Sequence, residues 1–442
     1  MRLNPNYVPK ERKLNKKILI PLVVLLMVGS VLGFNYLQNL NEMEDTGFKF
    51  CNFSSKETAE ILENRQAAVY GTSKYLKVSD YNVHGETLKF YHEPFSMNNM
   101  DAFIGNTIFL NNLCGLSVDE KIPFLLSHDA DIGIQLANLQ DGFYEIEILK
   151  DFDFHLLEYD GNIDETFTSI KRNGQIKQVR ILSDLDLIND NFETPMIKKQ
   201  LLFLEVSTLD DNDAYDIVLD PSALNYHDNG LINYGHFFGD IYEADEMYKI
   251  AEKIKTYLER YGLRVYLTRD SENAIDYFGE TGRLSDAYES KAKYYVHLRF
   301  ESSGHYMDRG LSVFYSNQTS NRFASNVAKQ ILNQTGLTPS PYEDGINMAG
   351  VYQTSKITGT NYDYNNLIRE TGGRITGAGQ YDIFYDLMAK QRDSKIGMQA
   401  IDILYGYMTD ANDYEVWTEA LDEIAEATAK GILIQLGIEI EG

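Results

Sequence analysis

The sequence predicts an α/β C-terminal domain, with a mostly parallel sheet flanked by helices, preceded by a β-rich, sandwich-like domain and an N-terminal transmembrane helix. Three observations predict this order. An uncharged apolar run occupies residues 18–34, short alternating runs broken by turns follow over residues 70–208, and strand-like and helix-like segments alternate over residues 215–442. The 442 residues are enough for two or three separate hydrophobic cores.

The composition is that of a folded and strongly acidic protein. Hydrophobic residues make up 43% and aromatic residues 12% of the chain, which argues against intrinsic disorder over most of its length. The formal net charge is -26 at pH 7. An acidic surface repels phosphate backbones, so we expect no nucleic-acid partner. Basic residues crowd into residues 1–17, as Arg2, Lys10, Arg12, Lys13, Lys16 and Lys17.

Residues 18–34 form the predicted membrane anchor. They read ILIPLVVLLMVGSVLGF, and at ~1.5 Å per residue this uncharged run is roughly 25 Å long, at the short end of what spans a bilayer. The basic residues 1–17 before it predict a cytoplasmic tail, with the bulk of the chain extracytoplasmic. The alternative is a cleaved signal peptide, but no A-x-A-like site follows the apolar run. We favour an uncleaved, single-pass anchor in the cell membrane.

Two segments precede the predicted α/β domain. Residues 35–69 are expected to form a stalk and a short helix, because a polar stretch is followed by a helix-like pattern. Residues 70–208 are expected to form the β-rich module, in which Asn173-Gly174 between alternating runs is the strongest hairpin signal. Nothing in this module resembles a catalytic constellation, so we interpret its acidic residues as a solvated face.

The two cysteines of the chain, Cys51 and Cys114, are too few for a disulfide framework and do not have the spacing of a zinc ribbon. One bridge between them is possible outside the cell. The expectation we favour is two unpaired or buried thiols.

Residues 215–442 carry the α/β pattern. Residues 243–261 place apolar side chains at helical spacing, and Gly262 follows where the terminal glycine of a helix belongs. Strands separated by helices predict a mostly parallel sheet covered on both faces. The other expected strands are 215–219, 263–268, 294–300 and 311–315, and the other expected helices are 283–292, 321–332 and a closing helix over 413–436 with Trp417 in the core.

Several segments of this domain, taken in order, resemble a known family. They read YDIVLDPSALN, GDIYEADEMYKIAEKIKTYLERYGLRVYLTRDSE and GRLSDAYESKAKYYVHLRF, followed by GLSVFYS and ILYGYMTDANDYEVWTEALDEIAEATAKGI. They resemble the zinc-dependent N-acetylmuramoyl-L-alanine amidases of bacterial cell walls, over about residues 215–437. The resemblance implies an amidase-like fold that holds one zinc ion. In the family, the zinc polarises the amide between the muramic acid lactyl group and L-alanine, and a glutamate is the general base for the attacking water.

The resemblance also implies where the zinc ligands and the base should lie. The first ligand of the family is the histidine of an Asp-Pro-Gly-His-Gly stretch, which here reads DPSA with Ala223 at the ligand position. The second ligand is a glutamate that opens the long helix, and Glu243 matches it. The third is the histidine of a Ser-Ile-His-x-Asn strand, where HLRFE places Arg299. The base is the glutamate of a Val-Glu-x-Gly-Phe strand, where ILYGY places Leu404.

These replacements predict a degenerate site. The side chains of Ala223 and Leu404 have no lone pair to give to a metal or a proton, and Arg299 is permanently cationic and cannot bind Zn²⁺. A guanidinium beside Glu243 would instead neutralise that carboxylate, standing where the zinc charge would have been. We therefore predict a direct ion pair between Glu243 and Arg299.

Other residues could rebuild the site. His227, His236 and His297 would supply nitrogen ligands alongside Glu243, although a histidine in a loop is more often a surface residue than a ligand. Glu370 is a weaker alternative for the base, because Glu-x-Gly also occurs in LIRETGGRITGAG. We favour a structural role for Glu370. No cofactor is expected, or zinc if these residues compensate.

The function predicted from these patterns is that of a membrane-anchored, extracytoplasmic pseudoenzyme of the cell envelope. It would bind or regulate peptidoglycan or another envelope component. One alternative is an active zinc amidase with relocated ligands. A second alternative is a surface or adhesion protein in which the domain is only a scaffold.

Overall fold

The computed structural model describes residues 47–92, 107–115, 133–159, 161–188, 199–210, 214–305, 308–342, 348–360, 362–372 and 395–440. The predicted cytoplasmic tail, the predicted membrane anchor and the stalk up to residue 46 lie outside these residues. Over the described ranges, no helix is both long and apolar enough to cross a membrane.

The first described helix, α2 (Ser55–Arg65), confirms the helical pattern read from the sequence. It begins with a capping box, in which the Ser54 hydroxyl accepts from the Glu57 amide at 3.3 Å and the Glu57 carboxylate accepts from the Ser54 amide at 2.9 Å. A π-helical turn, η1 (Gln66–Tyr70), continues helix α2. The buried Leu62 packs with aromatic residues of the neighbouring sheet.

A disulfide joins Cys51, just before α2, to Cys114, with the two Cα atoms 5.8 Å apart. The favoured expectation of unpaired thiols was therefore wrong. Cys114 follows strand β4 (Thr107–Asn112), so the bridge fastens the segment before α2 to the sheet. Spacing along the sequence could not reveal this contact, because 63 residues separate the two cysteines.

Two sheets make up the β-rich domain and share one hydrophobic core, whose members include Val83, Leu88, Ile146 and Val179. The larger sheet has the order β1–β7–β6–β10–β9–β8, with β4 also paired to β6. Its remaining strands are β1 (Lys74–Val78), β6 (Gly142–Lys150), β7 (Asp153–Tyr159), β8 (Ile163–Thr168), β9 (Ile176–Ser183) and β10 (Phe203–Leu209). Two short helical segments, η3 (Leu136–Asn138) and α3 (Leu185–Ile188), flank these strands.

The Asn173-Gly174 hairpin is confirmed. These two residues connect β8 and β9 with φ angles of 52° and 83°, and Arg172 pairs with Gln175 across the turn. Positive φ at both central positions is what the favoured two-residue hairpin turn requires, and Asn-Gly tolerates it best.

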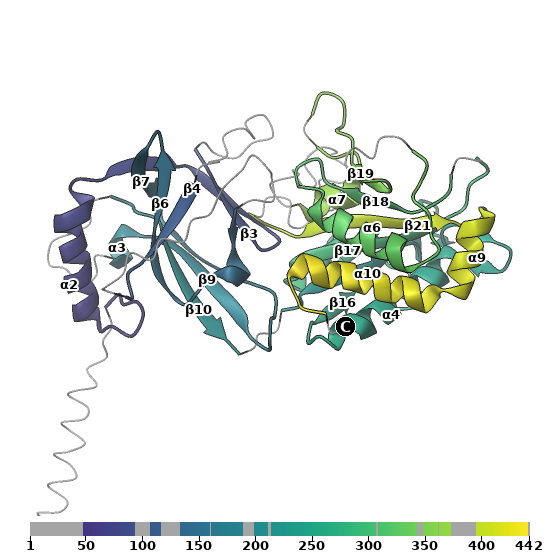
Figure 1. The fold of residues 1–442 in the computed structure, drawn as a ribbon, viewed down its shortest axis with the longest axis horizontal. Helices are drawn as coiled ribbons and strands as arrows, with labels where there is room; N and C mark the ends of the chain where they lie inside the picture. The colour runs from purple at the N-terminus through teal and green to yellow at the C-terminus, as the bar shows by residue number, and fades with distance from the viewer. Residues whose placement is uncertain are drawn as a thin grey trace, which may run out of the picture.

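The smaller sheet crosses the expected domain boundary. Its order is β20–β2–β3–β5, formed by β2 (Asp80–His84), β3 (Thr87–Tyr91), β5 (Ile134–Gln135) and β20 (Ile396–Gly397). β20 belongs by sequence to the α/β domain, yet it pairs in parallel with β2 of the β-rich domain. The α/β domain therefore adds a strand to its neighbour, and Figure 1 shows the two domains side by side.

The α/β domain contains the predicted mostly parallel sheet, in the order β16–β11–β17–β21–β18–β19. Its strands are β11 (Ile217–Pro221), β16 (Val265–Leu267), β17 (Tyr294–Glu301), β18 (Ser312–Tyr315), β19 (Val351–Gln353) and β21 (Gln399–Tyr407). All neighbouring strands run parallel except β18 and β21, which are antiparallel.

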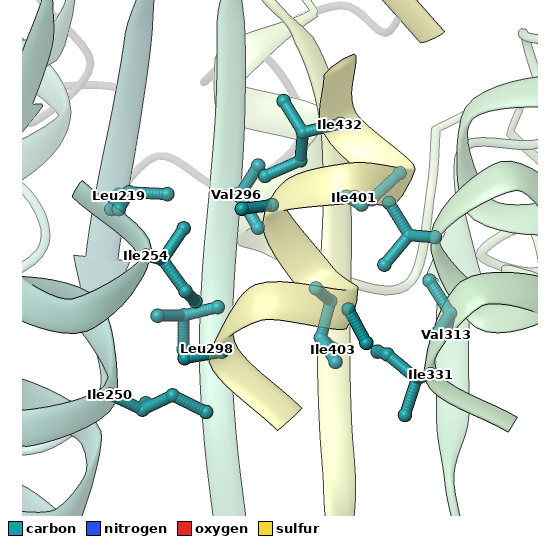
Figure 2. Packing of buried hydrophobic residues seen from close by; sticks show 14 of the residues in the cluster. Leu219, Ile250, Ile254, Val296, Leu298, Val313, Ile331, Ile401, Ile403 and Ile432 are labelled. Atoms are coloured by element: carbon teal, nitrogen blue, oxygen red, sulfur yellow. The ribbon is translucent and has the colours of Figure 1, made fainter. Parts of the chain in front are cut away.

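Helices cover both faces of this sheet, as expected. One face packs against α4 (Glu243–Glu259), α6 (Arg322–Gln334) and α10 (Leu421–Leu436), and the other against α5 (Arg283–Glu289) and α7 (Asn366–Thr371). Figure 2 shows the first of these cores, in which Ile254, Leu298 and Ile403 pack between helix and sheet.

The expected closing helix over residues 413–436 is divided in two. α9 (Ala411–Glu419) ends at Ala420, whose backbone (φ -127°, ψ 29°) is not helical, and α10 begins at the next residue. Neither glycine nor proline marks the break in the sequence. Trp417 on α9 is buried as expected and stacks on Phe300 of β17, with ring centroids 4.5 Å apart.

Candidate functional site

An open pocket of about 360 Å³ lies where strands β11 and β17 end and helix α4 begins. The crevice outside the carboxyl ends of parallel strands is the usual ligand site of α/β sheets. The pocket brings together five of the residues chosen from the sequence. It is lined by Ser222, Ala223, Asn225, Asn233, Gly235, His236, Glu243, Tyr277, His297, Arg299 and Glu301.

The turn after β11 places Ala223 at the pocket. Ala223 and Leu224 both have left-handed backbone, with φ of 57° and 53°, and their side chains form a small apolar cluster with Ala244. The fully buried Arg283 fixes this turn, because its guanidinium donates to the carbonyl oxygens of Ala223 and Leu224 and pairs with Asp220 at 3.1 Å. The methyl group of Ala223 thus contributes to packing rather than to polar chemistry.

Glu243 opens helix α4 with its carboxylate buried in the pocket wall. One oxygen accepts from the Ser222 hydroxyl at 2.5 Å, and the other accepts from the His236 backbone amide at 3.0 Å. Gly235 (φ 75°) packs closely against the Glu243 carboxylate. A Cβ at this position would lie 2.6 Å from the Ala223 Cβ and would overlap the carboxylate. Only glycine fits between these two residues.

The segment that carries Gly235 and His236 forms a rim over the pocket. It consists of two short hairpins, β12 (Asn225–Tyr226) with β13 (Ile232–Asn233) and β14 (Phe237–Phe238) with β15 (Ile241–Tyr242). Large apolar side chains along it face solvent, namely Tyr226, Leu231, Ile232, Tyr234, Phe237, Phe238 and Tyr242. We call this set the exposed aromatic rim.

Arg299 lies at the end of β17, directly across from Leu404 of β21 in the strand register. Its guanidinium makes two hydrogen bonds of 2.9 Å to Asp402 and pairs with Glu301. The predicted direct ion pair with Glu243 is not formed. The physical reason is that Asp402 lies two residues before Leu404 on the same strand face, close enough to Arg299 for its carboxylate to bind the guanidinium in place of Glu243.

The charges around Arg299 and Asp402 stabilise each other. Burial of the guanidinium would lower its pKa, but the carboxylates of Asp402, Glu301 and Glu243 raise that pKa above its ordinary value. Burial of Asp402 would raise its pKa, but Arg299 and His297 hold it well below the usual range. Both groups therefore remain charged.

His297 shares Asp402 with Arg299. Its Nδ1 lies 3.0 Å from the Asp402 carboxylate and its ring meets Tyr277 edge-on, with centroids 5.7 Å apart. The ring is buried, and its Nε2 has no hydrogen-bond partner in the part of the chain that the structure describes. His297 and Arg299, two residues apart on β17, both line the pocket.

Two of the weaker candidates lie elsewhere. His227 is exposed in the turn between β12 and β13 and does not line the pocket. Glu370 is buried in α7, where its carboxylate lies 3.4 Å from the Arg369 guanidinium, and it is not a pocket residue either. These contacts support the structural role that we favoured for Glu370.

The residues of the pocket do not fit a zinc ion. Ala223 offers no ligand atom, and the Arg299 guanidinium adds a fixed positive charge. Within the described ranges, no three His, Cys, Asp or Glu side chains are grouped so that they could hold a metal. The charged side chains of the pocket are engaged in hydrogen bonds and ion pairs with each other.

Sequence reasoning missed Asp402 and Ser222, which hold the charged residues of the pocket. A signal for Asp402 was present, because it is an acid in the otherwise apolar run AIDILY, two residues before Leu404 and hence on the same strand face. For Ser222 the only signal was its place next to Ala223.

The α/β domain is similar to proteins of one family. Residues 217–433 match the family model described as N-acetylmuramoyl-L-alanine amidase. Solved structures similar to the chain include the amidase AmiC2 of Nostoc punctiforme, with 23% identity, coverage of 50% of this chain and 97% of that chain, and a TM-score of 0.33. Another is Ami1 from Mycobacterium abscessus in its apo form, with 18% identity, coverage of 51% and 100%, and a TM-score of 0.35.

A third similar structure is the CwlD amidase from Clostridioides difficile in complex with the GerS lipoprotein, with 16% identity, coverage of 51% of this chain and 100% of that chain, and a TM-score of 0.33. No curated protein matches the chain. The α/β domain, over residues 217–433, belongs to the N-acetylmuramoyl-L-alanine amidase family.

Proposed function

We propose that this chain is a cell-envelope protein whose amidase-family domain binds peptidoglycan without cleaving it by the zinc chemistry of the family. One observation carries the proposal. The Arg299 guanidinium, held by Asp402 and Glu301, lies in the pocket beside Glu243, at a position where the family pattern places a histidine ligand.

The chemistry of the family needs groups that these positions do not supply. Zinc hydrolysis requires neutral or anionic ligands and a base that accepts the proton of the attacking water. Arg299 stays protonated in proteins, and Ala223 and Leu404 have no acceptor atom. The loss of this chemistry leaves the pocket free to bind, because a hydrogen-bonded cleft does not need a metal to recognise a ligand.

We further propose that residues 18–34 anchor the chain in the cell membrane, with both described domains outside. The disulfide between Cys51 and Cys114 supports this location, because disulfides persist in oxidising compartments and are rare in the cytosol. The crowding of basic residues into residues 1–17, directly before the apolar run, also supports this orientation.

A second candidate function is docking of a protein partner. The observation that favours it is the exposed aromatic rim, because large apolar side chains grouped on a surface mark interaction sites. The C. difficile amidase CwlD is described in complex with a lipoprotein. A protein partner would be captured by the rim, whereas a glycan would use both the rim and the pocket.

The test uses the full-length protein and purified peptidoglycan. We expect the protein to sediment with peptidoglycan and to release no stem peptide, as measured by mass spectrometry of the supernatant. The Glu243→Ala variant should release no less than the wild type. Release of stem peptide by the wild type but not by Glu243→Ala would contradict the proposal, and failure to sediment would favour the protein-partner function.

A further inference from the structure

The exposed aromatic rim and the pocket form one continuous surface. A single segment, residues 225–242, supplies the whole rim and also four of the residues that line the pocket, namely Asn225, Asn233, Gly235 and His236. Tyr234 lies between two of these pocket residues in the sequence, and Tyr242 directly precedes Glu243. A ligand that extends out of the pocket would therefore contact the rim.

The rim presents the faces of aromatic rings to solvent. Five of its seven side chains are aromatic. The rings of Phe237 and Tyr242 are 62% and 41% exposed, yet they stack on each other with centroids 5.9 Å apart, and Tyr234 meets Tyr242 at 6.2 Å. These contacts hold the rings in place before any ligand arrives. Because the face of an aromatic ring is electron-rich, it attracts the C–H groups on the flat apolar face of another ring.

The charge of this segment limits what can bind to it. Residues 223–246 contain five acidic residues and no Lys or Arg. An anionic lipid surface would be repelled, and so would a second copy of this chain, whose net charge is -26. A neutral ligand meets no such repulsion.

The pocket offers hydrogen-bond acceptors beside the rings. Glu301 has 22% of its side chain exposed and pairs with Arg299 through one oxygen. Glu243 accepts two hydrogen bonds, although a carboxylate has about four acceptor sites. The volume of about 360 Å³ lies in the range of small-molecule sites, roughly 300–1,000 Å³. A basic protein partner would tolerate the charge but would leave this concave space unfilled, whereas a chain of sugars has flat apolar faces and hydroxyl donors.

We propose that the exposed aromatic rim and the pocket together bind a neutral glycan strand of N-acetylated amino sugars. The aromatic rings stack on the sugar faces, and the carboxylates of Glu243 and Glu301 accept hydrogen bonds from sugar hydroxyl groups. The inference rests on the proposed function and deepens it, because it assigns recognition of peptidoglycan to the glycan rather than to the stem peptide.

The test is isothermal titration calorimetry of the full-length protein with two soluble probes. One is the hexamer of N-acetylglucosamine, which is neutral and carries no peptide, and the other is the stem peptide released from peptidoglycan. We expect the hexamer to bind and the stem peptide to give no heat of binding. The hexamer should also release the protein from sedimented peptidoglycan.

Variants separate stacking on a ring from general apolar contact. Phe237→Leu keeps an apolar side chain but removes the ring face, so it should weaken binding of the hexamer by roughly two- to tenfold. Tyr242→Phe keeps the ring and should bind within about twofold of the wild type. Phe154→Leu is the matched control, because Phe154 is 44% exposed and also pairs with another ring, Phe109 at 5.2 Å, but lies in the β-rich domain. It should leave the affinity unchanged.

A further variant tests the pocket. Glu301→Ala removes an acceptor of a charge-assisted hydrogen bond, so it should weaken binding of the hexamer by at least about tenfold. Equal affinity of this variant and the wild type would overturn the placement of the sugar in the pocket, and equal affinity of Phe237→Leu would overturn the stacking.

The inference and the proposed function fail in different ways. If the protein sediments with peptidoglycan but the hexamer does not bind, or only the stem peptide binds, the inference is overturned and the proposed function stands. If the protein neither sediments with peptidoglycan nor binds the hexamer, both are overturned, and the rim is left as a surface for a protein partner.

Discussion

Replacing Asp402 by alanine should destabilise the α/β domain strongly, because this carboxylate has several donors to satisfy. It is 1% exposed and accepts from Arg299 Nε and Nη2 at 2.9 Å, from His297 Nδ1 at 3.0 Å and from Asn365 Nδ2 at 2.8 Å. Removing one partner of a buried ion pair costs about 3–5 kcal/mol. Because Arg299 is 24% exposed and keeps Glu301, we expect the lower end, about 3 kcal/mol.

The chain contains a matched control for this variant in its β-rich domain. Arg180 is held by Asp164 through two hydrogen bonds, of 2.6 and 3.0 Å, and by Glu205 at 3.1 Å, which is the arrangement seen around Arg299. The Asp164 side chain is 46% exposed, whereas that of Asp402 is 2% exposed. Exposed pairs contribute about 0–1 kcal/mol, so Asp164→Ala should have a small effect.

The assay is differential scanning calorimetry of the full-length protein and both variants at pH 7. A loss of about 3 kcal/mol corresponds to a fall of roughly 6–12 °C in the Tm of a domain of this size. Trp417 is the only tryptophan of the chain and is buried in the α/β domain, so its fluorescence assigns the shifted transition to that domain. Equal small shifts for Asp402→Ala and Asp164→Ala would refute the view that burial makes Asp402 the anchor of Arg299.

Three further outcomes are expected. Burial raises the pKa of Asp216 from 3.8 to about 6. The folded state therefore binds the proton more tightly, and the free energy of unfolding should fall by about 2 kcal/mol between pH 4.5 and 7. Urea titrations at both pH values should show that this pH dependence disappears in Asp216→Asn, and a pH profile that is the same in the variant and the wild type would contradict the prediction. Reduction of the disulfide between Cys51 and Cys114, which closes a loop of 63 residues, should destabilise the β-rich domain by at most roughly 4 kcal/mol. The Tm of this domain should therefore fall when reductant is added, and a Tm that does not change would argue against the disulfide. Phe237 and Phe238 are 62% and 47% exposed, so replacing either by alanine should change the free energy of unfolding by no more than about 0.5 kcal/mol. The affinity of each variant for peptidoglycan should nevertheless fall by about tenfold. Sedimentation assays in which the variants and the wild type bind equally would exclude the rim as a contact surface.

Much of the α/β domain could be predicted, because its signals are local. Alternating strands and helices, and a glycine after α4 at Gly262 (φ 77°), reflect backbone and burial preferences that act over a few residues. The positions of Ala223, Glu243 and Arg299 in one pocket followed from the order of family motifs. Short local patterns in the β-rich domain, such as the Asn173-Gly174 turn, could be predicted for the same reason.

Contacts between distant parts of the chain could not be predicted. β20 joins β2 although more than 300 residues separate them, and only tertiary packing brings the two edges together. The partner of Arg299 was misjudged because the sequence shows the positions of motifs but not the distances between side chains. Asp402, between apolar residues of a central strand, was the better choice on physical grounds, since a buried carboxylate needs a cation nearby.

The most direct test of the central claim is the zinc content of the full-length protein after dialysis against micromolar zinc. The claim is that Arg299 stands in place of a metal-binding side chain. We expect the wild type to retain almost no zinc, and a variant with Ala223→His and Arg299→His to gain it, because histidine tolerates the left-handed backbone at Ala223. One zinc per chain in the wild type, lost on Glu243→Ala, would contradict the claim.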